Sequence, residues 1–205
     1  MKIRRWIAAG IAAAGLAAAL PAPSASAWTQ PSLAQILLAD SALDNAAGFD
    51  GFAYDFDIVT QALLGYPDLV AAASNPGDYT VFLPTDQAFR SLVHSLTGQW
   101  ISRERDVFNV VASLGADTVK TVLTYHIVAG ARISYSQALA ADGAQVTTLQ
   151  GGTIEVDVVQ NWWLKRVALI DKDPDLRNPK VILPNLRASN GIAHAIDFVL
   201  LPVNL

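Results

Sequence analysis

The hydrophobic period changes along this chain, and that change limits the fold more than any other feature of the sequence. Before Ala144, apolar residues recur three and four positions apart, as they do on amphipathic helices. From Ala144 onward they alternate with polar residues or form short runs between Gly-Gly and Asn-Gly turns, which is typical of strands. Helices followed by strands predict an α+β fold, with N-terminal helices packed against a C-terminal antiparallel β-wedge.

Capping residues indicate where the helices begin. Ser32, Asp57 and Thr85 stand at the start of apolar helical stripes, where their side chains can accept backbone hydrogen bonds. Ser134 and Gln137 have the spacing of a capping box. The expected helices lie near 32–40, 57–65, 67–74, 85–97, 102–115, 117–130 and 134–140.

The expected strands are short and, after Ala144, close together in sequence. Gly151 and Gly152 lie in the middle of two β runs and predict a hairpin. Strands are expected at 80–83, 145–161, 165–173, 180–186 and 191–201. Period-two alternation predicts that one face of the last strand carries Ile192, His194, Ile196, Phe198 and Leu200.

Residues 1–27 have the pattern of a secretory signal peptide. A basic start precedes a short apolar run, and Ala25-Ser26-Ala27 forms a small-residue cleavage site. The apolar run is short for a membrane span, which needs about 20 residues, although a retained anchor is the alternative. The expected product is a secreted single domain at 28–205, without membrane insertion and with its core at 32–202.

Charge and cysteine content exclude several classes of protein. The chain has no cysteine, so packing and hydrogen bonds must stabilise it without disulfides. Removal of the leader takes three of the 14 Lys and Arg and none of the 18 Asp and Glu, which leaves a net charge of −7. Nucleic acids and anionic lipids need basic surfaces, so neither is expected as a partner.

Three stretches taken together resemble the fasciclin domain family. TVFLPTDQAF at 80–89 resembles its first signature, and LTYHIVAG at 123–130 resembles its central Tyr-His element. ASNGIAHAIDFVLLP at 188–202 resembles its closing signature. The three follow in the family's order, and the similarity extends over nearly all of 32–202. The chain is therefore identified as a member, similar to secreted bacterial single-domain proteins.

The resemblance implies a role in adhesion to an extracellular matrix or cell envelope, without catalysis and without a cofactor. The implied partner is an extracellular or cell-surface protein or polysaccharide, and the implied state is a monomer or weak homo-oligomer. In animal relatives an Asp-Ile pair and the Tyr-His element are tied to receptor binding. Asp57-Ile58 and Tyr125-His126 match those positions here and become candidate binding residues.

His126 lies in the middle of an apolar helical stripe. A buried imidazole is most easily neutral and needs partners for both ring nitrogens. We interpret His126 as a core residue that hydrogen-bonds another signature, with Thr85, Asp86 and Asn190 as candidate partners. His194, expected on the inward face of the last strand, completes this structural motif.

The residues do not predict a metal site. His94, His126 and His194 form no HxxxH or HxH pair, and His94 is expected to be solvated. The loop DNAAGFDGFAYDFD at 44–57 has the composition of a calcium loop. Its spacing differs from that of an EF-hand and no Glu closes it, so we interpret it as a solvated acidic loop.

Two other classes of function are weaker alternatives. A small apolar or lipid ligand could lie between the helices and the wedge. A hydrolase of cell-wall polymers needs a positioned nucleophile and base, whereas Ser95 is merely adjacent to His94 and no G-x-S-x-G motif is present. Asp55, Asp57 and Asp86 could supply paired acids, but the first two are better explained as loop and cap residues.

Trp162 and Trp163 in NWWLKR are the most unusual candidates for a binding surface. Successive residues of a strand point to opposite faces, so one indole is expected to pack inward. The other would then be exposed near Lys165 or Arg166 as a binding anchor. The alternative is that the long loop 171–179 buries both indoles.

Overall fold

The computed structural model describes residues 30–42, 48–160 and 162–204, so the expected leader at 1–27 lies outside the described residues. The helices are α1 Leu33–Ala42, α2 Asp57–Leu64, α3 Pro67–Ser74, α4 Asp86–Thr97, α5 Glu104–Ser113, α6 Ala116–Tyr125 and α7 Tyr135–Leu139. The strands are β1 Tyr79–Pro84, β2 Ile127–Ala129, β3 Gln145–Thr147, β4 Thr153–Gln160, β5 Lys165–Ile170, β6 Val181–Ala188 and β7 Gly191–Ile196. Among the described residues, no helix has the length and apolar character needed to cross a bilayer.

The strands form two sheets. Sheet A has the order β2-β1-β7-β6, and sheet B has the order β3-β4-β5 with antiparallel pairs. The α+β class with antiparallel C-terminal strands is confirmed, and the structure adds one parallel pair, in which β1 lies beside β7 with Tyr79 opposite Gly191. A parallel pair needs a long crossover, and nearly the whole β half of the chain lies between these two strands.

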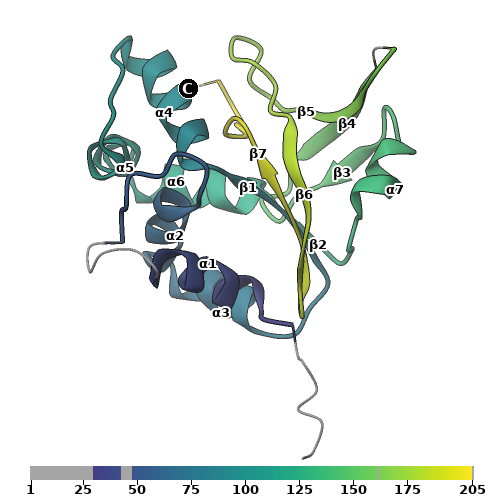
Figure 1. Cartoon of the computed structure of the whole chain (residues 1–205), viewed down its shortest axis with the longest axis horizontal. Helices are drawn as coiled ribbons and strands as arrows, with labels where there is room; N and C mark the ends of the chain where they lie inside the picture. Colours follow the sequence, from purple (N-terminus) through teal and green to yellow (C-terminus); the bar gives the residue numbers. More distant parts are fainter. Residues whose placement is uncertain (1–29, 43–47, 161, 205) are drawn as a thin grey trace, which may run out of the picture.

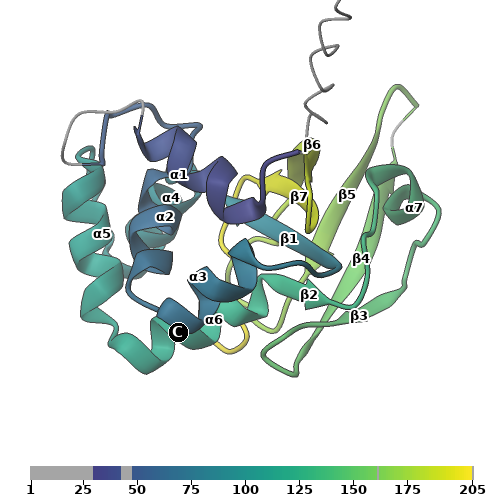
Figure 2. The ribbon, with the colours of Figure 1, turned by 90° about the horizontal axis from the view of Figure 1, so that it is seen from below.

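Sheet A lies between helices α1–α6 and sheet B, with α7 beside sheet B, as Figures 1 and 2 show from two directions. One core fills the space between the helices and sheet A and includes Ile58, Leu83 and Leu123. A second core, which includes Phe82 and Tyr125, lies between the two sheets. Because neighbouring strand residues point to opposite faces, Phe82 and Leu83 of β1 belong to different cores.

Local capping explains three of the helix starts. Ser32 Oγ accepts from Gln35 N at 3.2 Å, and Thr85 Oγ1 accepts from Ala88 N at 3.3 Å. Ser134 makes the expected capping box at α7. Asp57 was expected as an N-cap and is instead the first residue of α2, with Phe56 at the cap position. The reason is that the Asp57 carboxylate turns back to accept from Asp50 N at 3.1 Å.

The helix expected at 117–130 ends earlier than its apolar pattern suggested. Helix α6 ends at Tyr125, His126 occupies the C-cap position, and Ile127–Ala129 forms β2. The first two residues of β2 are β-branched, and β-branched residues favour strands. The backbone of β1 also needs a partner on this side, and Phe82 N donates to His126 O at 2.9 Å. The chain therefore changes from helix to strand at the Tyr-His element.

The last strand is buried on both faces. Strand β7 lies between β1 and β6, and the cores on either side of sheet A cover it. The expected shared face stops at Ile196, where β7 ends. Beyond that point Phe198 packs in the helical core and Leu200 packs between the sheets. The prediction that all five residues share one face is therefore wrong for Phe198, whereas Leu200 packs in the same core as Ile196 although it lies beyond the strand.

Candidate functional site

His126 joins the central element to the closing segment of the chain. It is 3% exposed. Its Nδ1 lies 2.7 Å from Val122 O, and its Nε2 lies 3.0 Å from Leu200 N. A carbonyl only accepts and an N–H only donates, so the proton is on Nδ1 and Nε2 is the acceptor. Burial lowers the pKa of His126 to about 4, which keeps the ring neutral.

The partners proposed for His126 were wrong. Thr85 caps α4, and Asp86 Oδ1 accepts from Ile58 N at 3.0 Å. Asn190 accepts from Leu33 N at 2.9 Å and donates to two carbonyls at the end of α3. His126 does form a hydrogen bond with another signature, the closing one. Its partner there is the backbone N–H of Leu200, which no side-chain pattern indicates.

The other two histidines lie in different surroundings. His194 is buried and its Nε2 lies 2.9 Å from Ile133 O, while burial lowers its pKa. His94 is exposed and contacts the ring of Trp100. Both placements agree with the sequence interpretation. His126 and His194 each use both ring nitrogens on backbone groups, with Asn185 N donating to His194 Nδ1 at 3.3 Å.

The candidate binding residues of the two family motifs are inside the molecule. Asp57, Ile58 and Tyr125 are each 0% exposed. Tyr125 donates its hydroxyl to Thr153 O at 2.8 Å, and burial raises its pKa to about 12. The expectation that Asp57 and Ile58 form a binding surface is therefore wrong for this structure, because α2 turns its first residues toward the core. These residues act on any surface only by supporting it.

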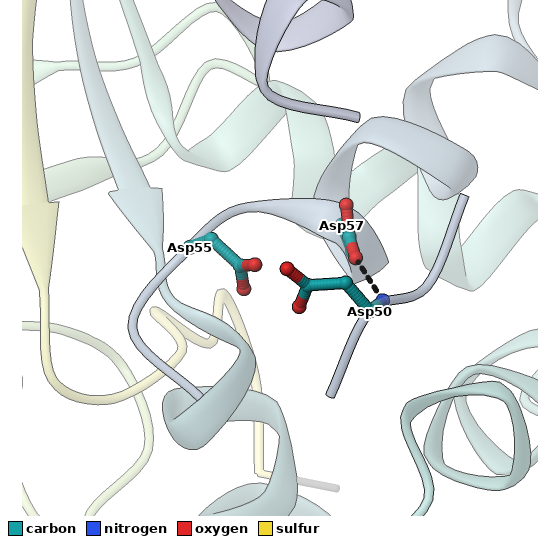
Figure 3. Close-up of side chains that lie close together, drawn as sticks. All are labelled: Asp50, Asp55 and Asp57. Carbon is teal, nitrogen blue, oxygen red and sulfur yellow. Dashed lines mark hydrogen bonds between the residues drawn. The ribbon is translucent and has the colours of Figure 1, made fainter. Parts of the chain in front are cut away.

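Asp57 belongs to a larger group of acidic residues, which we call the acid cluster. Its members are Asp50, Asp55, Asp57, Asp86 and Glu104. Asp50 and Asp55 lie in the loop before α2, and the other three are the first residues of α2, α4 and α5. Asp50, Asp55 and Asp57 place carboxylate oxygens within 4.8 Å of one another, and so do Asp55, Asp86 and Glu104. Figure 3 shows the carboxylates of Asp50 and Asp55 facing each other beside Asp57.

Backbone hydrogen bonds fold the loop over this cluster. Gly51 N donates to Glu104 Oε2 at 2.9 Å, and Asp86 N donates to Asp55 O at 3.1 Å. Arg90 Nη2 donates to Glu104 Oε1 at 2.8 Å and supplies a positive charge. The loop expected to be solvated therefore has Asp55 and the neighbouring Asp57 directed inward.

Burial and, to a smaller extent, neighbouring carboxylates raise the pKa values of Asp55 and Asp86. Burial raises the pKa of Asp55 to about 7, with further contributions from Asp50 and Glu104. Burial also raises the pKa of Asp86 to about 9, against the hydrogen bond from Ile58 N, and neighbouring carboxylates add to the rise. Such a group is stable either with bound protons or with a cation among its oxygens.

Trp162 and Trp163 lie at the tip of the β4–β5 hairpin, between the two strands rather than within one. They are 81% and 73% exposed, with ring centroids 3.4 Å apart. Both sequence alternatives, one indole buried or both buried, are therefore wrong, because strand alternation does not apply in the turn. The tip projects from sheet B away from the helices, at the upper right of Figure 1.

The cavities between helices and sheet A are small. An apolar space of about 50 Å³ lies between α1, α3 and β1, with His126 in its wall. Drug-sized ligands occupy roughly 300–1,000 Å³. A shallow groove of about 250 Å³ lies instead near the hairpin tip, lined by Val159, Leu164, Arg166 and Lys180.

The family model of the Fasciclin domain matches residues 55–202. The uncharacterized protein sll1735 of Synechocystis sp. is 30% identical over 134 residues, which cover 65% of this chain and 80% of that protein. Human periostin is 31% identical over 139 residues, which cover 66% of this chain and 13% of periostin. A FAS1 domain pair from the insect cell adhesion molecule Fasciclin I gives a TM-score of 0.59 at 15% identity, over 84% of this chain and 51% of that chain.

The architecture, with helices and a second sheet on opposite faces of sheet A, is that of a FAS1 module. The family match covers well over half of the chain and includes all three signature segments. The chain belongs to the fasciclin domain family, as the resemblance predicted.

Proposed function

We propose that this chain is a secreted, non-catalytic adhesion module that binds an extracellular matrix or a cell envelope through the tip of the β4–β5 hairpin. The observation that carries the proposal is the exposure of two adjacent indoles, Trp162 and Trp163. The fold of a domain pair from an insect cell adhesion molecule supports an adhesive role. The signal-peptide pattern of residues 1–27 supports secretion.

An exposed tryptophan pair is apolar surface that folding leaves in water and that a binding partner can cover. Covering an indole of roughly 200 Å² is worth up to about 5 kcal/mol in transfer free energy. The folded domain recovers little of this at Trp162 and Trp163. A partner that covers both rings gains it, and tryptophan is among the residues that dominate binding energy at interfaces.

The charge around the tip favours an anionic polysaccharide over a protein partner. The chain is acidic as a whole, yet residues 158–166 contain no Asp or Glu. Lys165 and Arg166 are exposed beside the indoles, and Lys180 lines the neighbouring groove. A flat aromatic face can stack on a sugar ring while the cations attract its carboxylate or phosphate groups.

The alternatives find less support in the geometry. Ser95 Oγ donates to Ser91 O at 3.0 Å, in the manner of a helix surface serine. Asp86, a candidate acid for a hydrolase, is 0% exposed, and its backbone N–H donates to Asp55 O in the loop before α2. A lipid would need several times the space of about 50 Å³ between helices and sheet A.

Binding of purified protein to isolated cell-envelope polysaccharide and to matrix protein tests the proposal. The double variant W162A/W163A should bind polysaccharide about tenfold or more weakly than the wild type. Trp100 provides a matched control, because it is 58% exposed and lies between α4 and α5, outside the β4–β5 hairpin. W100A should bind within about twofold of the wild type.

The same assay identifies the results that contradict the proposal. Equal affinity of W162A/W163A and the wild type would exclude the tip as the contact surface. A wild type that binds protein but no polysaccharide would exclude the partner class. Circular dichroism of both variants shows whether the fold is intact.

A further inference from the structure

Adhesion through the hairpin tip leaves the acid cluster without a role. Asp57 and Asp86 are 0% exposed and Glu104 is 3% exposed. Buried ionised carboxylates are costly unless they are paired, hydrogen-bonded or bound to a metal. The N-termini of α2, α4 and α5 offset part of this cost, and Arg90 offsets more through Glu104. These contacts account for a helix-capping role but not for the convergence of five carboxyl groups.

A second observation indicates a ligand among these groups. Within the described part of the chain, Asp55 Oδ1 and Asp86 Oδ2 are buried without a hydrogen-bond partner. The Asp86 carboxylate uses Oδ1 for Ile58 N, so its second oxygen is left for another partner. Buried polar atoms in native proteins nearly always have a partner, and a bound ion is one such partner.

The spacing of the oxygens fits a calcium ion. Calcium is coordinated by six to eight oxygens at about 2.3–2.6 Å, so oxygens on opposite sides of the ion are about 5 Å apart. Asp55, Asp86 and Glu104 each place an oxygen within 4.8 Å of the others. Magnesium demands a stricter octahedron and usually keeps several waters, which fits a buried, carboxylate-rich site less well.

We propose that the acid cluster binds a calcium ion through Asp55, Asp86 and Glu104, with Asp50 as a further ligand from the loop. Asp55 belongs to both groups of carboxylates and lies between them. Two ligands come from the loop at 50–55, and two come from the first residues of α4 and α5. The ion therefore attaches this loop to the helical core and fixes the start of α2.

Isothermal titration of calcium chloride into EDTA-treated protein tests the site, with magnesium chloride as a second titration. The wild type should bind one calcium ion per chain in or below the millimolar range of extracellular sites, and more tightly than magnesium by about tenfold. Saturating calcium should raise its melting temperature by about 5 °C. D86N and D55N should each weaken calcium binding by about tenfold or more.

The choice of variants separates loss of the site from loss of the fold. Asparagine at position 86 keeps the oxygen that accepts from Ile58 N and removes a repulsive charge, so D86N should stay folded in EDTA. D117N is the matched control, because Asp117 is exposed in the first turn of α6. It should bind calcium like the wild type.

Two results would overturn the proposal. One is the absence of calcium binding by the folded wild type at about 1 mM calcium. The other is calcium binding that D55N and D86N leave unchanged, which would place the ion elsewhere. Neither result depends on adhesion, so the site and the hairpin surface are tested separately.

Discussion

Replacing His126 by alanine measures what the buried imidazole contributes to stability. The change removes the acceptor of Leu200 N, at 3.0 Å, and the donor to Val122 O, at 2.7 Å. An unpartnered buried N–H costs about 1–3 kcal/mol, and the lost ring leaves a cavity in a closely packed region. The expected loss of unfolding free energy is roughly 3–5 kcal/mol, which lowers the melting temperature by about 10 °C for a domain of this size.

Differential scanning calorimetry of matched variants assigns the effect to individual hydrogen bonds. H126Q places its amide oxygen near the position of Nε2 and can still accept from Leu200 N, whereas H126N reaches only as far as Nδ1. Because an orphaned buried N–H is less tolerated than an orphaned carbonyl, H126Q should be the more stable of the two. His94 is exposed, so H94A should change stability by no more than about 0.5 kcal/mol.

The reasoning fails if H126A melts no lower than H94A, because the ring would then contribute nothing that an exposed histidine does not. It also fails if H126N is more stable than H126Q, since the Leu200 bond would then be the less important of the two.

Two further outcomes follow from buried polar groups. Asn190→Ala removes three hydrogen bonds to the backbone of α1 and the end of α3, so it should cost about 2–4 kcal/mol and increase limited proteolysis near α1. Acid should reduce the stability difference between the wild type and H126Q. Burial lowers the folded pKa of His126 to about 4 from an ordinary value of 6.5, so only the unfolded chain binds this proton between those values. The contribution is present above pH 6.5 and falls by up to about 3 kcal/mol as the pH approaches 4, measured by urea unfolding. Asp55 and Asp86, whose pKa values are raised, act in the opposite direction and cancel in the difference.

The features that sequence predicts well here are local. Thr85 caps α4 and Ser134 caps α7 because the accepting side chain and the donating backbone are three residues apart. The hairpin at Gly151 is also predicted from local sequence, because Gly151 has a left-handed φ of 101°, which glycine adopts without strain. The fold class followed from the order of such local elements.

The candidate sites were harder to predict because their partners are distant in sequence. His126 bonds a backbone N–H 74 residues away, and a backbone group has no signature in a sequence. Asp55 meets Glu104 only because α2, α4 and α5 begin at the same place in the fold. Strand alternation does not describe Trp162 and Trp163, because they belong to the turn between β4 and β5. Spacing within the acidic loop does not reveal Glu104, because this residue approaches the loop from α5.

The central position of β7 also sets the order in which the molecule can be assembled. Its neighbours are β1, which is made early, and β6, which is made just before it. A nascent chain that stops short of Gly191 has an incomplete middle sheet, and both hydrophobic interiors lack one wall. Closing so long a loop is entropically expensive, so the productive folding step waits for the C-terminal segment. We therefore expect cooperative collapse to follow the synthesis of almost the entire polypeptide.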